Sequence, residues 1–195
     1  MEMLVAQSTA HKRERLAAAA AQLVLERGLD GATIAAIADL AGVPQGSVYY
    51  ALRTKAEIAQ AAAAHVAAQR RDSIETWDAA ESAVERLVAY LEAASDTARE
   101  TARTGSLPTL AGRLRGVASE AAETAATAVR ETIAWAARQF EEMGFSADAA
   151  QARALHLVSG IEGAGELAHA LGDPLPITRE AAHLSRWVAN ARSSS

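Results

Sequence analysis

Residues 33–58 have the sequence TIAAIADLAGVPQGSVYYALRTKAEI, and this stretch decides the fold of the chain. Thr33 can cap a helix that Gly42 ends after about two turns, and a second short helix can begin at Pro44, where the missing N–H costs nothing. The apolar positions of the first helix lie at helical spacing and are Ile34, Ile37, Ala38 and Ala41. Two such short helices bury little surface, so the pattern predicts a compact helix-turn-helix supported by longer neighbours.

The rest of the chain predicts only helices. A first helix runs over residues 11–27 and ends at Gly28, and a capping-box sequence at residues 54–57 begins a long helix that extends to about residue 73. The remaining expected helices cover residues 82–103, 117–143, 146–171 and 178–192, the last of them capped by Thr178, with glycine and proline breaks over residues 105–116. We therefore expect an all-α fold: an N-terminal three-helix helix-turn-helix DNA-binding domain over residues 9–69, and a C-terminal bundle of about six helices over residues 70–195.

In a helix-turn-helix that binds DNA, the second helix lies in the major groove and its first residues contact the base edges. Gln45 and Ser47 are placed to contact bases, and Gly46 would let the backbone approach DNA closely. The tyrosines and the lysine that follow would contact phosphates or a thymine methyl group. The candidate DNA-binding residues are Thr33, Gln45, Gly46, Ser47, Tyr49, Tyr50 and Lys55.

The same stretch resembles the signature of the TetR family of transcription regulators. The resemblance rests on the threonine cap, the Ile-Ala pair, Ala-Gly-Val at residues 41–43, Gly46 three residues before Tyr49, and Lys55 six residues after it. Ala51 and Leu52 depart from the pattern, because the family usually has an aromatic residue or histidine and then phenylalanine. Ala35 and Ala36 also stand where a basic residue is common.

The resemblance implies a dimeric regulator, acting as a repressor that binds a palindromic operator and is released by a small hydrophobic effector. It also implies that the last two helices pair with those of a second subunit. Small residues in the middle of the helix at 146–171 favour close contact with a partner helix or a ligand, and a kink is the alternative. The candidate dimer residues are Gly160, Ile161, Gly163, Ala164, Leu167, Leu171, Leu184, Trp187 and Val188.

An effector pocket is expected in the C-terminal bundle, although each candidate residue is also compatible with an ordinary core. The candidate pocket residues are Trp77, Tyr90, Leu110, Trp135, Phe140, Met143 and His156. So few aromatic residues argue against stacking on a large flat ligand, and they leave a lipid-like or aliphatic effector open. The turn at residues 105–114 is similar to that of the LmrA and YxaF branch of the family.

Composition limits the classes of function. The formal net charge is −5, but residues 1–55 hold six Lys or Arg against five Asp or Glu, and the rest hold thirteen against nineteen, so the acidity belongs to the C-terminal part. With no cysteine and only scattered histidines, we expect no metal site and no cofactor, and the absence of a signal or membrane-spanning segment favours a cytoplasmic protein. An all-helical enzyme and a binding protein with an inactive helix-turn-helix remain as alternatives, although no catalytic constellation supports the first.

Overall fold

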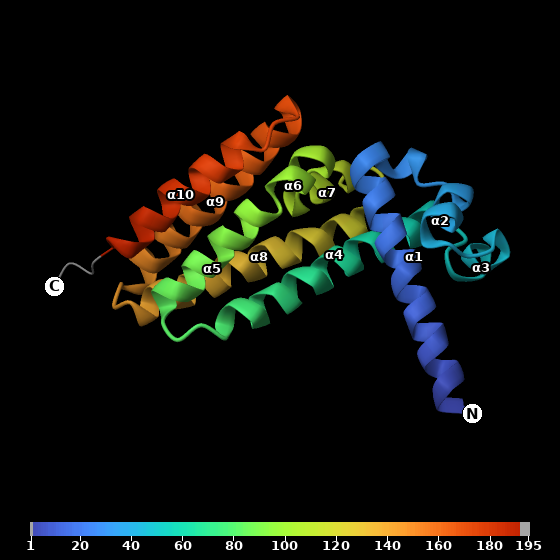
Figure 1. Ribbon diagram of the computed structural model, residues 1–195, viewed down its shortest axis with the longest axis horizontal. Coiled ribbons are helices and arrows are strands. Elements are labelled where there is room, and N and C mark those ends of the chain that lie inside the picture. Colours follow the sequence, from blue (N-terminus) through green and yellow to red (C-terminus); the bar gives the residue numbers. More distant parts are fainter. Residues whose placement is uncertain (1, 192–195) are drawn as a thin grey trace. The chain divides into compact units, whose positions relative to one another are not determined.

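The computed structural model describes residues 2–191, and within this part of the chain every regular element is a helix (Figure 1). The helices are α1 (Glu2–Gly31), α2 (Ile34–Ala41), α3 (Gln45–Ala51), α4 (Lys55–Asp78), α5 (Ala83–Asp96), α6 (Ala98–Thr104), α7 (Leu107–Leu114), α8 (Ser119–Glu142), α9 (Ala147–Leu171) and α10 (Leu175–Ala189). The prediction of an all-α fold is confirmed. None of these helices is both long and apolar enough to span a membrane.

The helices form two compact units, which we call unit 1 and unit 2. Unit 1 contains the chain up to Gln69 and Leu107–Ala126, and unit 2 contains Arg70–Ser106 and the chain from Thr127 onward. Helices α4 and α8 each contribute residues to both units. The functional division into residues 9–69 and 70–195 stays a prediction, and its last four residues lie outside the described part.

The segment Leu107–Ala126 belongs to unit 1 because it bonds to α1 and α4. The Arg113 guanidinium on α7 donates to the carbonyl oxygens of Val24, at 3.3 Å, and of Leu25. The amide of Gln60 donates to the Thr124 hydroxyl at 3.1 Å. Arg113 therefore satisfies carbonyl groups at the end of the first part of α1, where no helical partner follows.

Helix α1 ends its regular course at the predicted glycine. Gly28 has φ 73° and ψ 174°, which is not a helical conformation, and a short turn continues to Gly31. The helix begins at Glu2, well before the expected start at residue 11. Its buried face contains Leu16, Leu23 and Val24.

Helix α2 is capped at both ends by the residues that the sequence indicated. The Thr33 hydroxyl accepts a hydrogen bond from the backbone N–H of Ala36 at 3.2 Å, which caps α2. Gly42 adopts the left-handed conformation (φ 62°, ψ 42°), and Val43 donates to the Ala38 carbonyl at 3.0 Å. This hydrogen-bonded ending satisfies the last carbonyls of α2 and turns the chain into α3.

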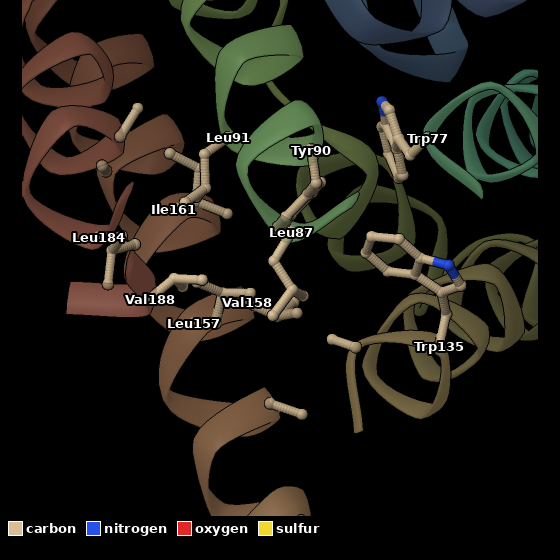
Figure 2. Close-up of a cluster of buried hydrophobic side chains, with 14 of the residues drawn as sticks. Trp77, Leu87, Tyr90, Leu91, Trp135, Leu157, Val158, Ile161, Leu184 and Val188 are labelled. Carbon is tan, nitrogen blue, oxygen red and sulfur yellow. The ribbon is translucent and has the colours of Figure 1, made fainter. Parts of the chain in front are cut away.

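The core of unit 2 is built mainly from small and aliphatic side chains of α5, α9 and α10, with an aromatic group beside them (Figure 2). Helix α10 packs against α5 and α9, and α6 packs against α9. The labelled aliphatic residues of this core are Leu87, Leu91, Leu157, Val158, Ile161, Leu184 and Val188. Numerous alanines between them let the helix backbones approach closely.

Besides the early start of α1, several helix boundaries differ from the sequence prediction. Helix α4 continues to Asp78 instead of ending near residue 73, and α7 forms within residues 105–116, where glycine and proline breaks were expected. The expected helix at residues 82–103 is divided at Thr97, whose hydroxyl bonds the Ala93 carbonyl at 2.9 Å and competes with the regular backbone pattern. Helix α10 begins at Leu175 rather than after Thr178, because the Asp173 carboxylate accepts from the Leu175 N–H at 2.9 Å. Thr178 is therefore not a cap, and the expected end of this helix at residue 192 lies outside the described residues.

Replacing Gly42 by alanine tests the turn. A Cβ atom there would be strained by the left-handed backbone and would approach Arg15 Nη2 at 3.1 Å. We expect Gly42→Ala to lower the free energy of unfolding by about 1–2 kcal/mol. Gly112→Ala is the matched control, since a Cβ at this helical position meets nothing within 4 Å. The control should raise that free energy by up to about 1 kcal/mol in chemical denaturation. Equal behaviour of the two variants would contradict this account of the turn.

Candidate nucleic-acid interface and candidate ligand site

Helix α3 has one buried anchor and an exposed outer face. Val48 is fully buried in unit 1, whereas Gln45 and Gly46 are exposed. Tyr49 and Tyr50 have exposed fractions of 61% and 84%, which is unusual for side chains of this size. The side chains that the sequence assigned to DNA contact are thus available to a partner, and Val48 holds the helix that carries them.

Ser47 differs from its neighbours because its hydroxyl is already engaged. It is half-buried and accepts a hydrogen bond from the Lys12 ammonium on α1 at 2.7 Å. This bond places a cation beside the start of α3. Sequence patterns give no sign of this contact, because a bond between residues 35 positions apart leaves no local signal.

A second basic residue of α1, Arg15, has a structural role. The guanidinium of Arg15 donates to the carbonyl oxygens of Ala41 and Gly42, the second at 3.1 Å. Arg15 thereby supplies donors for the last carbonyls of α2, as cations near a helix C-terminus commonly do. It stabilises the turn, and the residue itself remains exposed.

Two carboxylates bond to residues at or just before the start of α4. Lys55 forms an ion pair with Asp30, and the hydrogen bond and charge of Lys55 lower the pKa of that carboxyl group. Glu57 accepts from the backbone N–H groups of Arg53 at 2.6 Å and Thr54 at 2.9 Å, and these bonds lower the pKa of Glu57. The predicted capping box is present, and the lysine expected to contact phosphate is held by an acid.

Two further observations complete this face. Arg53, which sequence reasoning did not single out, is exposed and lies with its Cζ 5.8 Å from the Tyr50 ring centroid. Thr33 is exposed too, and its hydroxyl serves the cap of α2. An open groove of about 680 Å³ lies beside α3 and is lined by Lys12, Arg13, Leu16, Ala17, Gly46, Ser47, Tyr50, Ala51, Leu52 and Ala61.

Most of the predicted pocket residues belong to the hydrophobic core of unit 2, where their rings form two groups. Trp77, Tyr90 and Trp135 lie together in unit 2, with ring centroids 5.0 to 6.1 Å apart (Figure 2). A second group contains Phe140 and His156, whose rings lie 5.7 and 5.0 Å from Trp187, and Met143 packs against the same core. Leu110 is buried in unit 1, so it belongs with neither group.

A buried ion pair lies beside the first aromatic group. Arg70 Nη2 is 3.2 Å from Glu162 Oε1, and the side chains are 19% and 15% exposed. The Arg70 Cζ lies 5.9 Å from the ring centroids of both Trp77 and Tyr90. Burial, and after it the charge of Glu162, raises the pKa of Tyr90 against the opposing effect of Arg70, so this phenol keeps its proton. Its Oη has no hydrogen-bond partner among the described residues.

The predicted dimer residues divide by exposure. Those buried within unit 2 are Ile161, Ala164, Leu184 and Val188, and Gly160 and Trp187 are half-buried. The exposed ones are Gly163, Leu167 and Leu171, the two leucines with exposed fractions of 58% and 69%. The exposed residues are available to a partner, whereas the buried ones are covered by the chain's own core.

The glycines of α9 have separate explanations. A Cβ on Gly160 would meet Glu180 Oε1 at 3.0 Å and Leu184 Cδ1 at 3.2 Å, so this glycine lets α10 pack closely on α9 in the same chain. A Cβ on Gly165 would be in ordinary contact with Thr101 of α6. At Gly163 nothing lies within 4 Å, so no neighbour inside the chain requires a glycine there.

A metal site has no support in the described residues, where no three His, Asp or Glu side chains come together in a way that could hold an ion. The site that stands out instead is the exposed face of α3 on its buried anchor. A short helix with a buried anchor and an exposed outer face is the arrangement that a DNA-binding helix-turn-helix presents to the major groove.

Comparison with known proteins finds one family model that matches part of the chain and several solved structures of similar fold. Residues 16–62 match the family described as bacterial regulatory proteins, tetR family. Among solved structures, the TetR transcriptional regulator from Chloroflexus aurantiacus is similar with a TM-score of 0.76 at 22% identity, over 94% of this chain and 97% of that one. The regulatory protein TetR from Rhodobacter sphaeroides gives 0.73 at 23%, over 88% and 96%. None of the curated proteins compared with the chain is a match.

Residues 16–62 therefore match the model of the tetR family, and the chain has, along its length, the fold of TetR transcription regulators. The resemblance that the sequence predicted is confirmed, and the LmrA and YxaF branch stays a prediction. Regulators of this family are transcription factors and not enzymes.

The ion pair at Lys55 yields a test of DNA affinity. Asp30→Asn should release the lysine for phosphate contact, since the two side chains are exposed and pair with one another. We expect tighter binding of duplex DNA at low salt and a slope of log K against log salt that steepens by about 0.9 for each additional phosphate that the protein neutralises. Asp96→Asn, an exposed change of the same charge in unit 2, is the control for net charge. Identical slopes for both variants would mean that Lys55 does not reach phosphate.

Proposed function

We propose that the chain acts as a homodimeric, ligand-responsive repressor that binds a palindromic operator and is released from it by a small hydrophobic effector. The observation that carries this proposal is the outer face of α3, where Gln45, Gly46 and Tyr49 are exposed while Val48 anchors the helix. A protein without a partner gains nothing from leaving two adjacent tyrosines in water.

Contact with bases is assigned to Gln45 and contact with phosphate to Tyr49 and Tyr50. A glutamine amide can bond the edge of adenine through both of its atoms, and such a pair discriminates between bases by about 1–3 kcal/mol. Lys12 supports this geometry from α1 by its bond to Ser47. Ser47 is therefore assigned to position the helix as well as to contact DNA.

Dimerisation is assigned to one face of α9. Exposed residues recur there at intervals of four, and they are Leu155, Ser159, Gly163, Leu167 and Leu171. We call this row the α9 ridge. It has large apolar side chains at its ends and small ones in the middle, and rows of this spacing pack into the grooves of a neighbouring helix. The small centre would let a partner backbone approach closely, which accounts for the glycine at 163.

Two helix-turn-helix units joined in a dimer can occupy successive major grooves, which are about 34–36 Å apart. Binding is then strong because the second contact is intramolecular, and it weakens when the spacing no longer fits. An effector that binds better to a mismatched state of the dimer would release the operator by shifting the population toward that state. The aromatic group of Trp77, Tyr90 and Trp135 is the proposed place for it.

Footprinting of the DNA upstream of the chain's own coding sequence tests the proposal as a whole. We expect protection of a palindromic site at nanomolar protein, with the two halves about one helical turn apart. A helical binding protein with an inactive helix-turn-helix would give no protected palindrome. Protection of an asymmetric single site would contradict the dimer model.

Substitutions on α3 test which residues contact the operator. Gln45→Ala should weaken operator binding by about tenfold or more and relax specificity at one base pair. Tyr49→Ala should weaken binding to all sequences alike, because it removes a phosphate contact. Val117→Ala, an exposed change elsewhere in unit 1, is the control in gel-shift titrations. Unchanged affinity in both α3 variants would remove the assignment.

Gly46→Ala separates DNA contact from stability. A Cβ there meets nothing within 4 Å in the free chain and lies in a helix, so the variant should unfold at an equal or higher temperature than wild type. Operator binding should nevertheless weaken, because the added methyl group would stand between the helix and the base edges. Full retention of operator affinity would show that the backbone does not approach DNA at this position.

The α9 ridge predicts the oligomeric state. Leu167→Glu places a charge at the proposed seam, and we expect this variant to be monomeric by light scattering and to bind the operator far more weakly. Val117→Glu introduces the same charge at an exposed apolar position, 67% exposed, and should remain a dimer. A dimer that survives Leu167→Glu and Leu171→Glu together would place the seam elsewhere.

A further inference from the structure

Beside the aromatic group of unit 2, two polar side chains have more hydrogen-bond donors than the chain supplies acceptors. Arg70 carries five N–H donors, and its Nη2 donates to Glu162 Oε1 at 3.2 Å. The guanidinium also lies beside the Tyr90 hydroxyl and opposes the rise in the pKa of that phenol, without forming a hydrogen bond of regular geometry. Tyr90 is 2% exposed, and its hydroxyl has no partner among residues 2–191. Buried polar groups are normally bonded, so an unbonded phenol next to a sparsely bonded guanidinium indicates that another molecule supplies acceptors.

The two groups face the same place. Both rings that flank the Arg70 guanidinium, Trp77 and Tyr90, lie with their centroids 5.9 Å from its Cζ, and Trp135 lies 5.3 Å from Trp77 (Figure 2). The Trp135 indole N–H is held by Asp78 Oδ1 at 2.7 Å, so this ring has a fixed orientation. A polar centre is thus bordered by three aromatic walls, as in many small-molecule sites.

A groove at the surface of unit 2 reaches the same cluster. It has a volume of about 310 Å³, and Ile74 and Trp135 are among the residues that line it. Ile74 also packs against the core, and it shares a face of α4 with Arg70 and Trp77, which are four residues before it and three after it. This volume is at the lower end of the range of about 300–1,000 Å³ that ligand sites occupy, so a molecule with a single ring is the size to expect.

The charges decide which acceptor fits. Arg70 is neutralised by Glu162, and Tyr90 stays protonated because burial and Glu162 both raise its pKa. A ligand carboxylate beside Tyr90 would add a buried negative charge next to Glu162, which is costly in a low dielectric. Two other arginines, Arg71 and Arg138, line the open groove together with Glu75 and Glu131. A carbonyl oxygen accepts from the phenol and from the free guanidinium N–H groups without adding any charge.

We infer that the effector is an uncharged molecule with one apolar ring and a carbonyl oxygen, and that the oxygen is bound by Tyr90 Oη and the Arg70 guanidinium. This inference rests on the proposed function, because it names the chemistry of the effector site of that regulator. The ring lies against Trp77 and Trp135, next to the groove at Ile74. Glu162 is a positioning residue that holds Arg70 toward the ligand.

The test compares four single-ring probes on the full-length protein. Acetophenone and benzamide carry a neutral carbonyl group, ethylbenzene has the same kind of body without an oxygen, and benzoate carries a carboxylate. Binding is followed by tryptophan fluorescence in the Trp187→Phe background, which leaves Trp77 and Trp135 of the three tryptophans as reporters. We expect acetophenone and benzamide to bind about tenfold more tightly than ethylbenzene, the change expected from one to two buried hydrogen bonds, and more tightly than benzoate.

Tyr90→Phe removes only the hydroxyl group and should abolish the preference for acetophenone over ethylbenzene. Its melting temperature should equal or exceed that of wild type, since the hydroxyl has no partner among the described residues. Arg70→Lys keeps a cation for Glu162 but not the planar fork, and it should weaken acetophenone binding as well. Thr132→Val is the matched control, because it removes a buried hydroxyl that already bonds the Ala128 carbonyl at 2.9 Å. This control should keep the preference for the carbonyl probes.

Several results would overturn the inference. These are equal binding of acetophenone and ethylbenzene, tighter binding of benzoate, no saturable binding of either carbonyl probe, and a melting temperature of Tyr90→Phe below that of Thr132→Val. The operator footprint of each variant is measured alongside. If wild type protects a palindromic site but does not bind the carbonyl probes, the effector chemistry is rejected and the proposed regulator is retained. If wild type gives no footprint, the proposed regulator is rejected.

Discussion

The left-handed turn at Gly42 is the constraint on which the interface depends. Because the backbone reverses there with φ 62°, α3 leaves α2 at an angle that buries Val48 and exposes its neighbours. The capping bond of Thr33 at one end of α2 and the donors of Arg15 at the other keep this short helix intact. Neither α2 nor α3 is long enough to be stable alone, so these local bonds and the packing on α1 replace the stability that length would give.

Unit 2 also combines limited apolar burial with a few specific polar bonds. Alanine-rich helices approach one another closely but bury little apolar area per residue, and only 4% of the chain is aromatic. Two of those aromatic residues, Trp77 and Tyr90, lie beside one buried arginine, and Trp135 packs against both rings. A buried ion pair is rarely the most stabilising choice for a core, because apolar residues of the same volume often serve better. Its presence beside an unbonded phenol is therefore better explained by recognition than by stability.

The sequence predicted what is encoded locally. Thr33, Gly42 and the capping box at residues 54–57 each depend on a few adjacent residues, and each appears where the pattern placed it. The exposure of Tyr49 likewise follows from the spacing relative to Val48. Contacts between distant residues were out of reach, because the bond from Lys12 to Ser47 and the packing of Leu107–Ala126 in unit 1 leave no periodic signal.

Periodicity was least informative where a helix has two apolar faces. On α9, Ile161 and Leu167 looked equivalent in the sequence, yet the first is 4% exposed and the second 58%. A repeat of three and four residues identifies an apolar stripe but not whether the chain's own core or a partner covers it. The α9 glycines follow the same logic, since a glycine can serve an internal neighbour, as at Gly160, or none, as at Gly163.

The position of Glu162 next to Gly163 links effector binding to dimerisation, the two activities proposed for unit 2. Glu162, which holds Arg70, precedes Gly163 on α9, so the residue that orients the buried guanidinium is adjacent to the middle of the α9 ridge. Adjacent helical residues point about a quarter-turn apart, so one faces the core while the next faces outward. A ligand bonded to the guanidinium that Glu162 holds would act on the buried side of α9 at the level where a partner helix would contact its exposed side. Effector binding and the geometry of the dimer would then be coupled through one turn of a single helix, with no need for a longer path.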